Sequence, residues 1–199
     1  MRDIIFTPRS WTEPLDWTEV FSQSQPIEVD LGCGKGTFLV QAAKSFPQRN
    51  FLGVERLLGR VRKAAKLIER EKLLNVGILR IEVCYAVQHL FPDESVAAYH
   101  IYFPDPWPKR RHHRRRLLTI EFVDALARTL QKGGQVHLAT DFEEYFYEMT
   151  KIFAGAAWQS MPPTERVGPE WRTDFEREFV AEGRKIFRAR YVCAPSPQP

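Results

Sequence analysis

The sequence predicts an α/β fold, a mostly parallel β-sheet with helices on both faces. Short apolar runs alternate with longer segments of helical periodicity, which is the pattern of parallel strands joined by crossover helices. Glycines directly after the first apolar run indicate a tight strand-to-helix turn. The length of 199 residues suits one compact domain. We place this domain at residues 26–193, after a lead segment at 1–25 and before a flexible tail at 194–199.

Six segments are strand candidates because they are short, apolar and rich in β-branched or aromatic residues. In chain order they are IEVDL (27–31), NFLGVE (50–55), VGILR (76–80), VAAYHIYF (96–103), GQVHLAT (134–140) and KIFRARYV (185–192). Between them apolar residues recur at helical spacing, as at Leu58, Val61, Ala65 and Ile68. These stripes predict helices that pack against the sheet.

Composition limits the class of protein. Apolar residues make up 44% and charged residues 27% of the chain, as in ordinary globular domains. No apolar stretch approaches the roughly 20 residues of a membrane-spanning helix. The first residues also lack the apolar core of a signal peptide, so we expect a cytoplasmic protein without a membrane partner. Three scattered cysteines and five histidines show no metal-ligand spacing, so we expect no metal site.

Positive charge is concentrated in one short segment. The formal net charge is +4, from 29 Lys and Arg against 25 Asp and Glu, and six of the basic residues lie between positions 109 and 116. Outside that segment 23 basic residues face 25 acidic ones. A basic stripe on a nearly neutral body indicates that a polyanion docks at one place. The alternative is a solvated surface, which charge runs more often form.

The segment DLGCGKGTF, residues 30–38, predicts a site for a nucleotide-like cofactor. Gly32, Gly34 and Gly36 allow the backbone to turn sharply and to approach a ligand closely. The spacing GxGxG differs from the GxGxxG of dinucleotide-binding folds. Asp30, two residues before the first glycine, would repel a pyrophosphate but attract the ammonium of a methionine moiety. We therefore expect S-adenosylmethionine as the cofactor.

Two more acidic residues stand at the ends of the next expected strands. Glu55 lies 19 residues beyond Gly36, where an acidic side chain can accept hydrogen bonds from both ribose hydroxyls. Glu82 follows the third strand and is placed to accept a hydrogen bond from the adenine amino group. Three acids at strand ends are more specific than a glycine loop alone, although acids there can also serve solubility.

The segment FPDPWPKRRHHRRR, residues 103–116, predicts a second site beside the first. Three prolines restrict the backbone around Asp105 and Trp107. Guanine presents N1–H and an exocyclic amino group as paired donors, which one carboxylate can accept together. Asp105 is therefore a candidate for reading a guanine base.

Together these motifs resemble the bacterial tRNA (guanine-N7)-methyltransferase family. The resemblance runs from Glu28 to Tyr191 and rests on DLGCGKG, FLGVE, FPDPWPKRRHHRRR, ATDFEEYF and RTDFEREFVAEG, of which FPDPWPK followed by basic residues is specific to the family. It implies a Rossmann-like S-adenosylmethionine-dependent methyltransferase fold with a seven-stranded sheet. It also implies that the substrate is the variable-loop guanine at tRNA position 46. No obligatory protein partner is implied.

Residue by residue, the resemblance implies contacts with cofactor and substrate. Asp30, Glu55 and Glu82 bind S-adenosylmethionine, and Asp105 touches both cofactor and substrate and is the catalytic residue. Because guanine N7 carries a lone pair and no proton, we expect Asp105 to position the base rather than to remove a proton. The substrate-binding positions are Lys109, Asp141, Thr173, Asp174, Phe175 and Glu176.

The acidic residues expected around the catalytic site would repel RNA phosphates, and the basic residues after FPDPWP would offset this repulsion. We expect them to bind the RNA backbone on either side of the target base. The residues expected in this role are Lys109, Arg110, Arg111, Arg114, Arg115 and Arg116.

Two departures from the family pattern and several alternatives accompany these predictions. Glu82 stands where the family usually has Asp, and the short lead segment lacks the arginine-rich sequence of many members. Thr140 and Asp141 also fit a strand-end turn that caps the next helix. The alternative functions are an amino-group methyltransferase acting on adenine or cytosine, and a noncatalytic RNA-binding module with a relic cofactor pocket.

Overall fold

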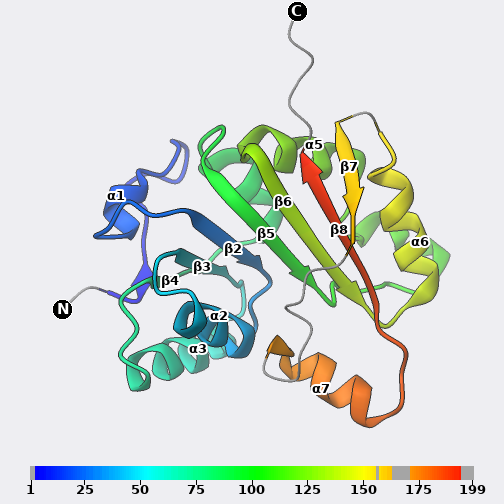
Figure 1. Ribbon diagram of the computed structural model, residues 1–199, viewed down its shortest axis with the longest axis horizontal. Coiled ribbons are helices and arrows are strands. Elements are labelled where there is room, and N and C mark those ends of the chain that lie inside the picture. Colours follow the sequence, from blue (N-terminus) through cyan, green and yellow to red (C-terminus); the bar gives the residue numbers. More distant parts are fainter. Residues whose placement is uncertain (1–2, 156, 163–170, 194–199) are drawn as a thin grey trace, which may run out of the picture.

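The computed structural model describes residues 3–155, 157–162 and 171–193, so the predicted tail at 194–199 lies outside the described residues. The described strands form one sheet of eight strands in the order β1-β4-β3-β2-β5-β6-β8-β7 (Figure 1). The pairings from β1 to β6 are parallel, and β8 is antiparallel to both β6 and β7. The strands are β1 (Ile5–Phe6), β2 (Ile27–Leu31), β3 (Asn50–Val54), β4 (Val76–Leu79), β5 (Val96–Tyr102), β6 (Leu130–Thr140), β7 (Trp158–Met161) and β8 (Phe187–Cys193).

Helical segments join most of these strands. They are α1 (Trp17–Val20), α2 (Thr37–Ser45), α3 (Leu58–Arg70), α4 (Val83–Tyr85), the π-helix η1 (Ala86–Leu90), the 3-10 helix η2 (Arg110–Arg115), α5 (Ile120–Thr129), α6 (Glu143–Ile152) and α7 (Asp174–Ala181). Within the described ranges, no helix has the length and apolar character needed to cross a bilayer.

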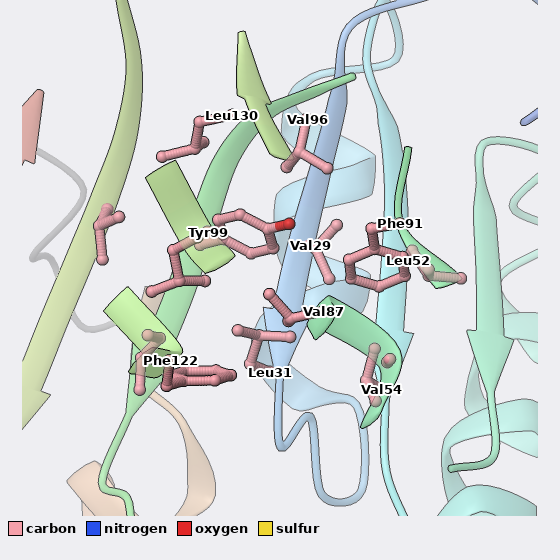
Figure 2. Packing of buried hydrophobic residues seen from close by; sticks show 14 of the residues in the cluster. Val29, Leu31, Leu52, Val54, Val87, Phe91, Val96, Tyr99, Phe122 and Leu130 are labelled. Atoms are coloured by element: carbon pink, nitrogen blue, oxygen red, sulfur yellow. The ribbon is translucent and has the colours of Figure 1, made fainter. Parts of the chain in front are cut away.

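The apolar core has two parts, one on each face of the sheet. On one face Val29, Leu31 and Val54 pack with residues of η1, α5 and α6 (Figure 2). On the other face Phe51 and Ile78 pack with residues of α2 and α3. Successive side chains of a strand point to opposite faces, so this division confirms the predicted helices on both faces.

The predicted fold class is confirmed, but the described sheet has eight strands where seven were expected. The six strand candidates correspond to β2, β3, β4, β5, β6 and β8, with shifts at some of their ends. The additional edge strands were missed because neither carries a buried apolar run: β1 has two residues, and the residues of β7 are exposed or half-buried.

Residues of the predicted lead segment belong to this same sheet and core. β1 pairs with β4, with Ile5 opposite Ile78. Leu15, Val20 and Phe21 are buried among the core residues of the first face. Apolar side chains in the lead therefore contribute to the stability of the sheet that carries the candidate site.

The candidate site lies where the strand order reverses. The chain passes outward from β2 to β3 and β4, then returns to place β5 on the other side of β2. In an open α/β sheet, this switch point leaves a crevice outside the carboxyl ends of the strands where ligands bind. Figure 1 shows α7 beyond the ends of β5 and β6, on the side of α2.

Candidate active site

The predicted glycine loop makes a sharp turn between β2 and α2. Gly32, Gly34 and Gly36 have φ angles of 87°, 57° and 81°, in the left-handed region that favours glycine. A side chain at Gly36 would also place its Cβ 2.9 Å from the Cβ of Ala64 in α3. The strand-to-helix turn expected from the sequence is therefore present, and it needs its glycines.

A pocket of about 220 Å³ adjoins this loop and is lined by residues far apart in the sequence. It brings together six residues predicted to bind cofactor or substrate, namely Asp30, Gly32, Gly34, Thr173, Asp174 and Phe175. The sequence analysis missed the remaining lining residues, which are Cys33, Lys35, Thr37, Phe38, Arg60, Tyr102 and Glu178. The glycine motif was a signal for the first four of these, because they share its loop or the first turn of α2.

Asp30 is the buried acid of this pocket, with a residue exposure of 5%. Burial, and secondly the nearby charge of Glu55, raise the pKa of Asp30 to about 8. A cationic group placed beside Asp30 would favour the ionised carboxylate and relieve this cost. The pocket therefore fits a ligand that carries a positive charge.

Glu55 and Glu82 follow β3 and β4, as predicted, but neither is among the described residues that line this pocket. The buried Glu55 accepts a hydrogen bond from the backbone N–H of Leu57 at 2.8 Å, and Arg60 Nη1 lies 3.7 Å from its other oxygen. The exposed Glu82 caps α4 by accepting from the backbone N–H of Tyr85 at 2.9 Å. Their contacts with ribose and adenine stay predictions.

Asp105 is exposed in the loop that follows β5. Two residues of this loop, Phe103 and Trp107, have φ angles of 53° and 43°. Bulky side chains rarely adopt this region, and such strain clusters at functional sites. The prolines are thus only part of what shapes the loop, because a backbone with these angles must also be held by its surroundings.

Neighbouring segments hold the Asp105 loop. The backbone N–H of Phe103 donates to the carbonyl of Ala139 in β6 at 2.7 Å. Arg116 Nε donates to the carbonyl of Pro106 at 2.8 Å, and the guanidinium of Arg115 lies 4.9 Å from the ring centroid of Trp107. Residues of the basic run therefore support the loop.

The basic run divides into exposed and buried residues. Lys109, Arg110, Arg111, Arg114 and Arg115 are exposed on and beside η2, as phosphate contacts require.

The prediction that Arg116 binds an RNA phosphate is wrong, because only 5% of this residue is exposed. Its guanidinium pairs with Glu148, lies 3.5 Å from Glu144 and stands over the ring of Tyr145 at 4.8 Å. Arg116 therefore anchors the Asp105 loop to α6. His113, Glu144 and Glu148 have possible metal-ligating atoms within 4.8 Å of one another, but both carboxylates already have the Arg116 guanidinium as a cationic partner.

Thr140 is the last residue of β6, and Asp141 follows it. Thr140 Oγ1 accepts from the backbone N–H of Phe142 at 3.2 Å, so the strand-end turn is correct for this residue. Asp141 instead accepts from Arg184 Nη1 at 2.8 Å, and α6 begins after Phe142 without a side-chain cap. The role of Asp141 in binding substrate stays a prediction.

The segment Thr173–Glu176 begins α7 and contacts the glycine loop. Thr173 caps the helix by accepting from the backbone N–H of Glu176 at 3.1 Å. Asp174 accepts from Thr37 Oγ1 at 2.8 Å and lies 3.6 Å from Lys35 Nζ. These contacts join the predicted cofactor and substrate segments.

The other two residues of this segment differ in exposure. Phe175 is 43% exposed, and its ring centroid lies 5.8 Å from the Arg60 guanidinium. Glu176 is buried and pairs with Arg188 of β8, with Arg172 also 3.6 Å away. Glu176 therefore ties α7 to the sheet, while Phe175 remains accessible to a ligand.

The chain matches known methyltransferases in sequence and in fold. Residues 24–189 match a family described as putative methyltransferase. A tRNA (guanine-N(7)-)-methyltransferase of Thermotoga maritima is 35% identical over 87% of this chain, and the match spans 56% of that relative's length. A protein of the same name from Syntrophotalea carbinolica is 37% identical over 96% of this chain and 87% of its own. The solved structure of the 16S rRNA methyltransferase KamB is 16% identical, with a TM-score of 0.68 over 98% of this chain and 100% of its own.

The glycine loop, the acids at the strand ends and the fold define an S-adenosylmethionine-dependent methyltransferase of Rossmann-like architecture. Within this class the relatives are more specific than the fold, because they are identical to this chain at more than a third of the aligned positions, over most of its length. The chain belongs to the tRNA (guanine-N(7)-)-methyltransferase family.

Proposed function

We propose that this chain transfers a methyl group from S-adenosylmethionine to N7 of the guanine at position 46 of the tRNA variable loop. The observation that carries the proposal is the pocket in which the glycine loop and the start of α7 meet. The exposed basic residues of η2 follow the Asp105 loop directly, so an RNA bound there would reach the site. Acting on tRNA, the enzyme would work in the cytoplasm.

Three acids would hold the cofactor, and the environment of Asp30 suits that task. When bound, S-adenosylmethionine supplies an electrophilic methyl group on a positively charged sulfur. Asp30 would accept from the methionine ammonium, since a cation beside it offsets the burial that raises its pKa. Glu55 would accept from the ribose hydroxyls and Glu82 from the adenine amino group. Glu55 now lies 3.7 Å from Arg60, a contact that ribose would share or replace.

Asp105 would position the guanine by accepting from its N1–H and its exocyclic amino group. N7 would attack the methyl carbon through its own lone pair while the carbon–sulfur bond breaks and the sulfur keeps its electron pair as a neutral thioether, so no residue has to remove a proton. The rate gain then comes mainly from holding the two reactants in line. The ring becomes cationic as N7 gains the methyl group, and the Asp105 carboxylate would also stabilise that charge.

The test is mass spectrometry of nucleosides from a tRNA incubated with the protein and S-adenosylmethionine. A matched tRNA with adenine at position 46 serves as the control. The proposal expects 7-methylguanosine only in the first tRNA. Methylated adenine or cytosine would instead favour an amino-group methyltransferase. If no nucleoside is methylated although calorimetry shows RNA binding, the chain is a noncatalytic RNA-binding module.

A further inference from the structure

Polar side chains form a buried row on the sheet face that α2 and α3 cover. Glu28, Asp30, His100 and His137 each have a residue exposure of 7% or less. In the strand register Asp30 lies beside His100, and His100 lies beside His137. The alternate residues of these strands on the opposite face, such as Val29, are apolar. Burying polar groups costs free energy unless they are bonded, and the proposed function uses only Asp30.

Three members of this face form a continuous chain of hydrogen bonds that ends at the pocket. His100 Nε2 lies 2.8 Å from Glu28 Oε2, and His100 Nδ1 lies 3.0 Å from the hydroxyl of Tyr102. Tyr102 lines the same pocket as Asp30. At the other end of the chain, Arg49 pairs with the second oxygen of Glu28.

The partners of these groups favour one direction for each hydrogen bond. The Arg49 partner favours an ionised Glu28, and an ionised carboxylate only accepts. His100 Nε2 must then carry a proton and donate it. In the neutral tautomer that carries its proton on Nε2, Nδ1 is an acceptor, and Tyr102 then donates its hydroxyl proton to it. Because the hydroxyl has one proton, its oxygen can act toward a ligand only as an acceptor.

Aromatic packing holds both rings of this chain in place. The ring of Phe38 meets the ring of Tyr102 edge-on, with 4.9 Å between centroids. The ring of His137 stacks on His100 at 4.9 Å, with 15° between the two planes. The position of the Tyr102 hydroxyl is therefore set before a ligand arrives, which lowers the entropy cost of binding.

We propose that Tyr102 is a cofactor-binding residue whose hydroxyl oxygen accepts a hydrogen bond from the methionine ammonium of S-adenosylmethionine, with Glu28 and His100 as its positioning residues. An ammonium has three donors and no acceptor, so it matches a carboxylate at Asp30 and an acceptor-only hydroxyl at Tyr102 in one pocket. This inference rests on the proposed cofactor site and adds a second partner for the ammonium.

The first test compares two ligands on Tyr102→Phe, which keeps the ring and removes only the hydroxyl. S-adenosylmethionine should bind about tenfold more weakly or worse, the loss expected for a hydrogen bond to a charged group. The affinity for 5′-methylthioadenosine, which has the nucleoside but no amino-acid portion, should stay within about twofold. In turnover, KM for S-adenosylmethionine should rise at unchanged kcat, because this contact does not change along the reaction.

Tyr99→Phe is the matched control. It removes a hydroxyl from the same strand, but Tyr99 lies on the opposite face (Figure 2) and bonds Thr129 at 2.7 Å. Its affinity for both ligands should equal that of the unmodified chain. Equal losses of both ligands in Tyr102→Phe, or no loss of either, would overturn the inference. A different result would overturn the proposed function itself: an unmodified chain that neither binds S-adenosylmethionine nor methylates guanine.

The second test reads the tautomer of His100 by nitrogen-15 NMR, with the signal assigned by its loss in His100→Gln. The inference requires a proton on Nε2 and none on Nδ1 at neutral pH or above. A proton on Nδ1 would make the Tyr102 hydroxyl an acceptor there and a donor toward the pocket. That result would exclude the proposed contact.

Discussion

Asp30 is a buried acid whose protonation depends on the fold. Its pKa rises from 3.8 to about 8 in the folded chain, so between these values folding takes up a proton. The stability that this group contributes is fully present below about pH 4 and is lost as pH rises to about 8. Asp30→Asn removes the titration. Its melting temperature should match the unmodified chain near pH 4 and exceed it by a growing margin up to about pH 8.

Calorimetry across this pH range checks the prediction, because the groups that are not coupled to Asp30 titrate alike in the two proteins and cancel. A constant difference in melting temperature would show that Asp30 is not the group that titrates. The same variant should bind S-adenosylmethionine more weakly, because it loses the carboxylate that faces the ammonium.

Asp105 differs from Asp30 in being exposed, and we expect it to act on the base rather than on stability. Asp105→Ala should reduce the single-turnover rate at least about tenfold, since it removes a charged acceptor worth about 1.5 to 3 kcal/mol. Affinity for S-adenosylmethionine should change by only a few fold, because Asp30 and Glu55 remain. An unchanged rate with saturating tRNA would remove Asp105 from the catalytic role.

At the scale of elements, η2 presents a basic surface that can be tested by its salt dependence. Replacing Arg110, Arg111 and Arg114 by Ala should weaken tRNA binding. Each lost phosphate contact should also flatten the slope of log affinity against log salt by about 0.7 to 0.9. The matched control replaces Arg62, Lys63 and Arg70 by Ala. These three replacements remove the same charge from the exposed face of α3. Equal slopes in the two triple variants would identify η2 as solvated surface.

Arg116 lies at the end of the same run, but its contacts predict a different result. Arg116→Met breaks its bonds to Pro106 and to the glutamates of α6. Removing one partner of a fully buried pair costs about 3 to 5 kcal/mol. The cost here should be lower because Glu144 and Glu148 keep access to solvent. We expect a lower melting temperature and, in the folded fraction, an unchanged salt slope for tRNA binding.

At the scale of the whole molecule, patterns along the chain predicted most of the fold and part of the site. Short apolar and aromatic runs located six of the eight described strands, of which β2 to β6 are mostly buried and β8 is half-buried apart from Tyr191. Glycine chemistry located the turn at Gly32. Tyr102 and Arg60 escaped notice because their roles depend on which strands and helices become neighbours. The burial of Arg116 could not be predicted either, because a run of like charges does not indicate which of its residues faces α6.

The contacts between α7 and the glycine loop predict that cofactor binding at the loop also stabilises α7. Asp174 bonds Thr37, and Trp171 stacks on Phe46 beyond the end of α2 at 5.6 Å between centroids. Ordering the glycine loop should therefore also slow local opening of α7. Hydrogen exchange with and without S-adenosylmethionine should show added protection at residues 32–37 and at α7, and little change in β7.

In Asp174→Ala the protection of α7 should be lost while that of residues 32–37 remains. Unchanged exchange of α7 in the unmodified chain, despite protection of the loop, would show that the two segments are not coupled.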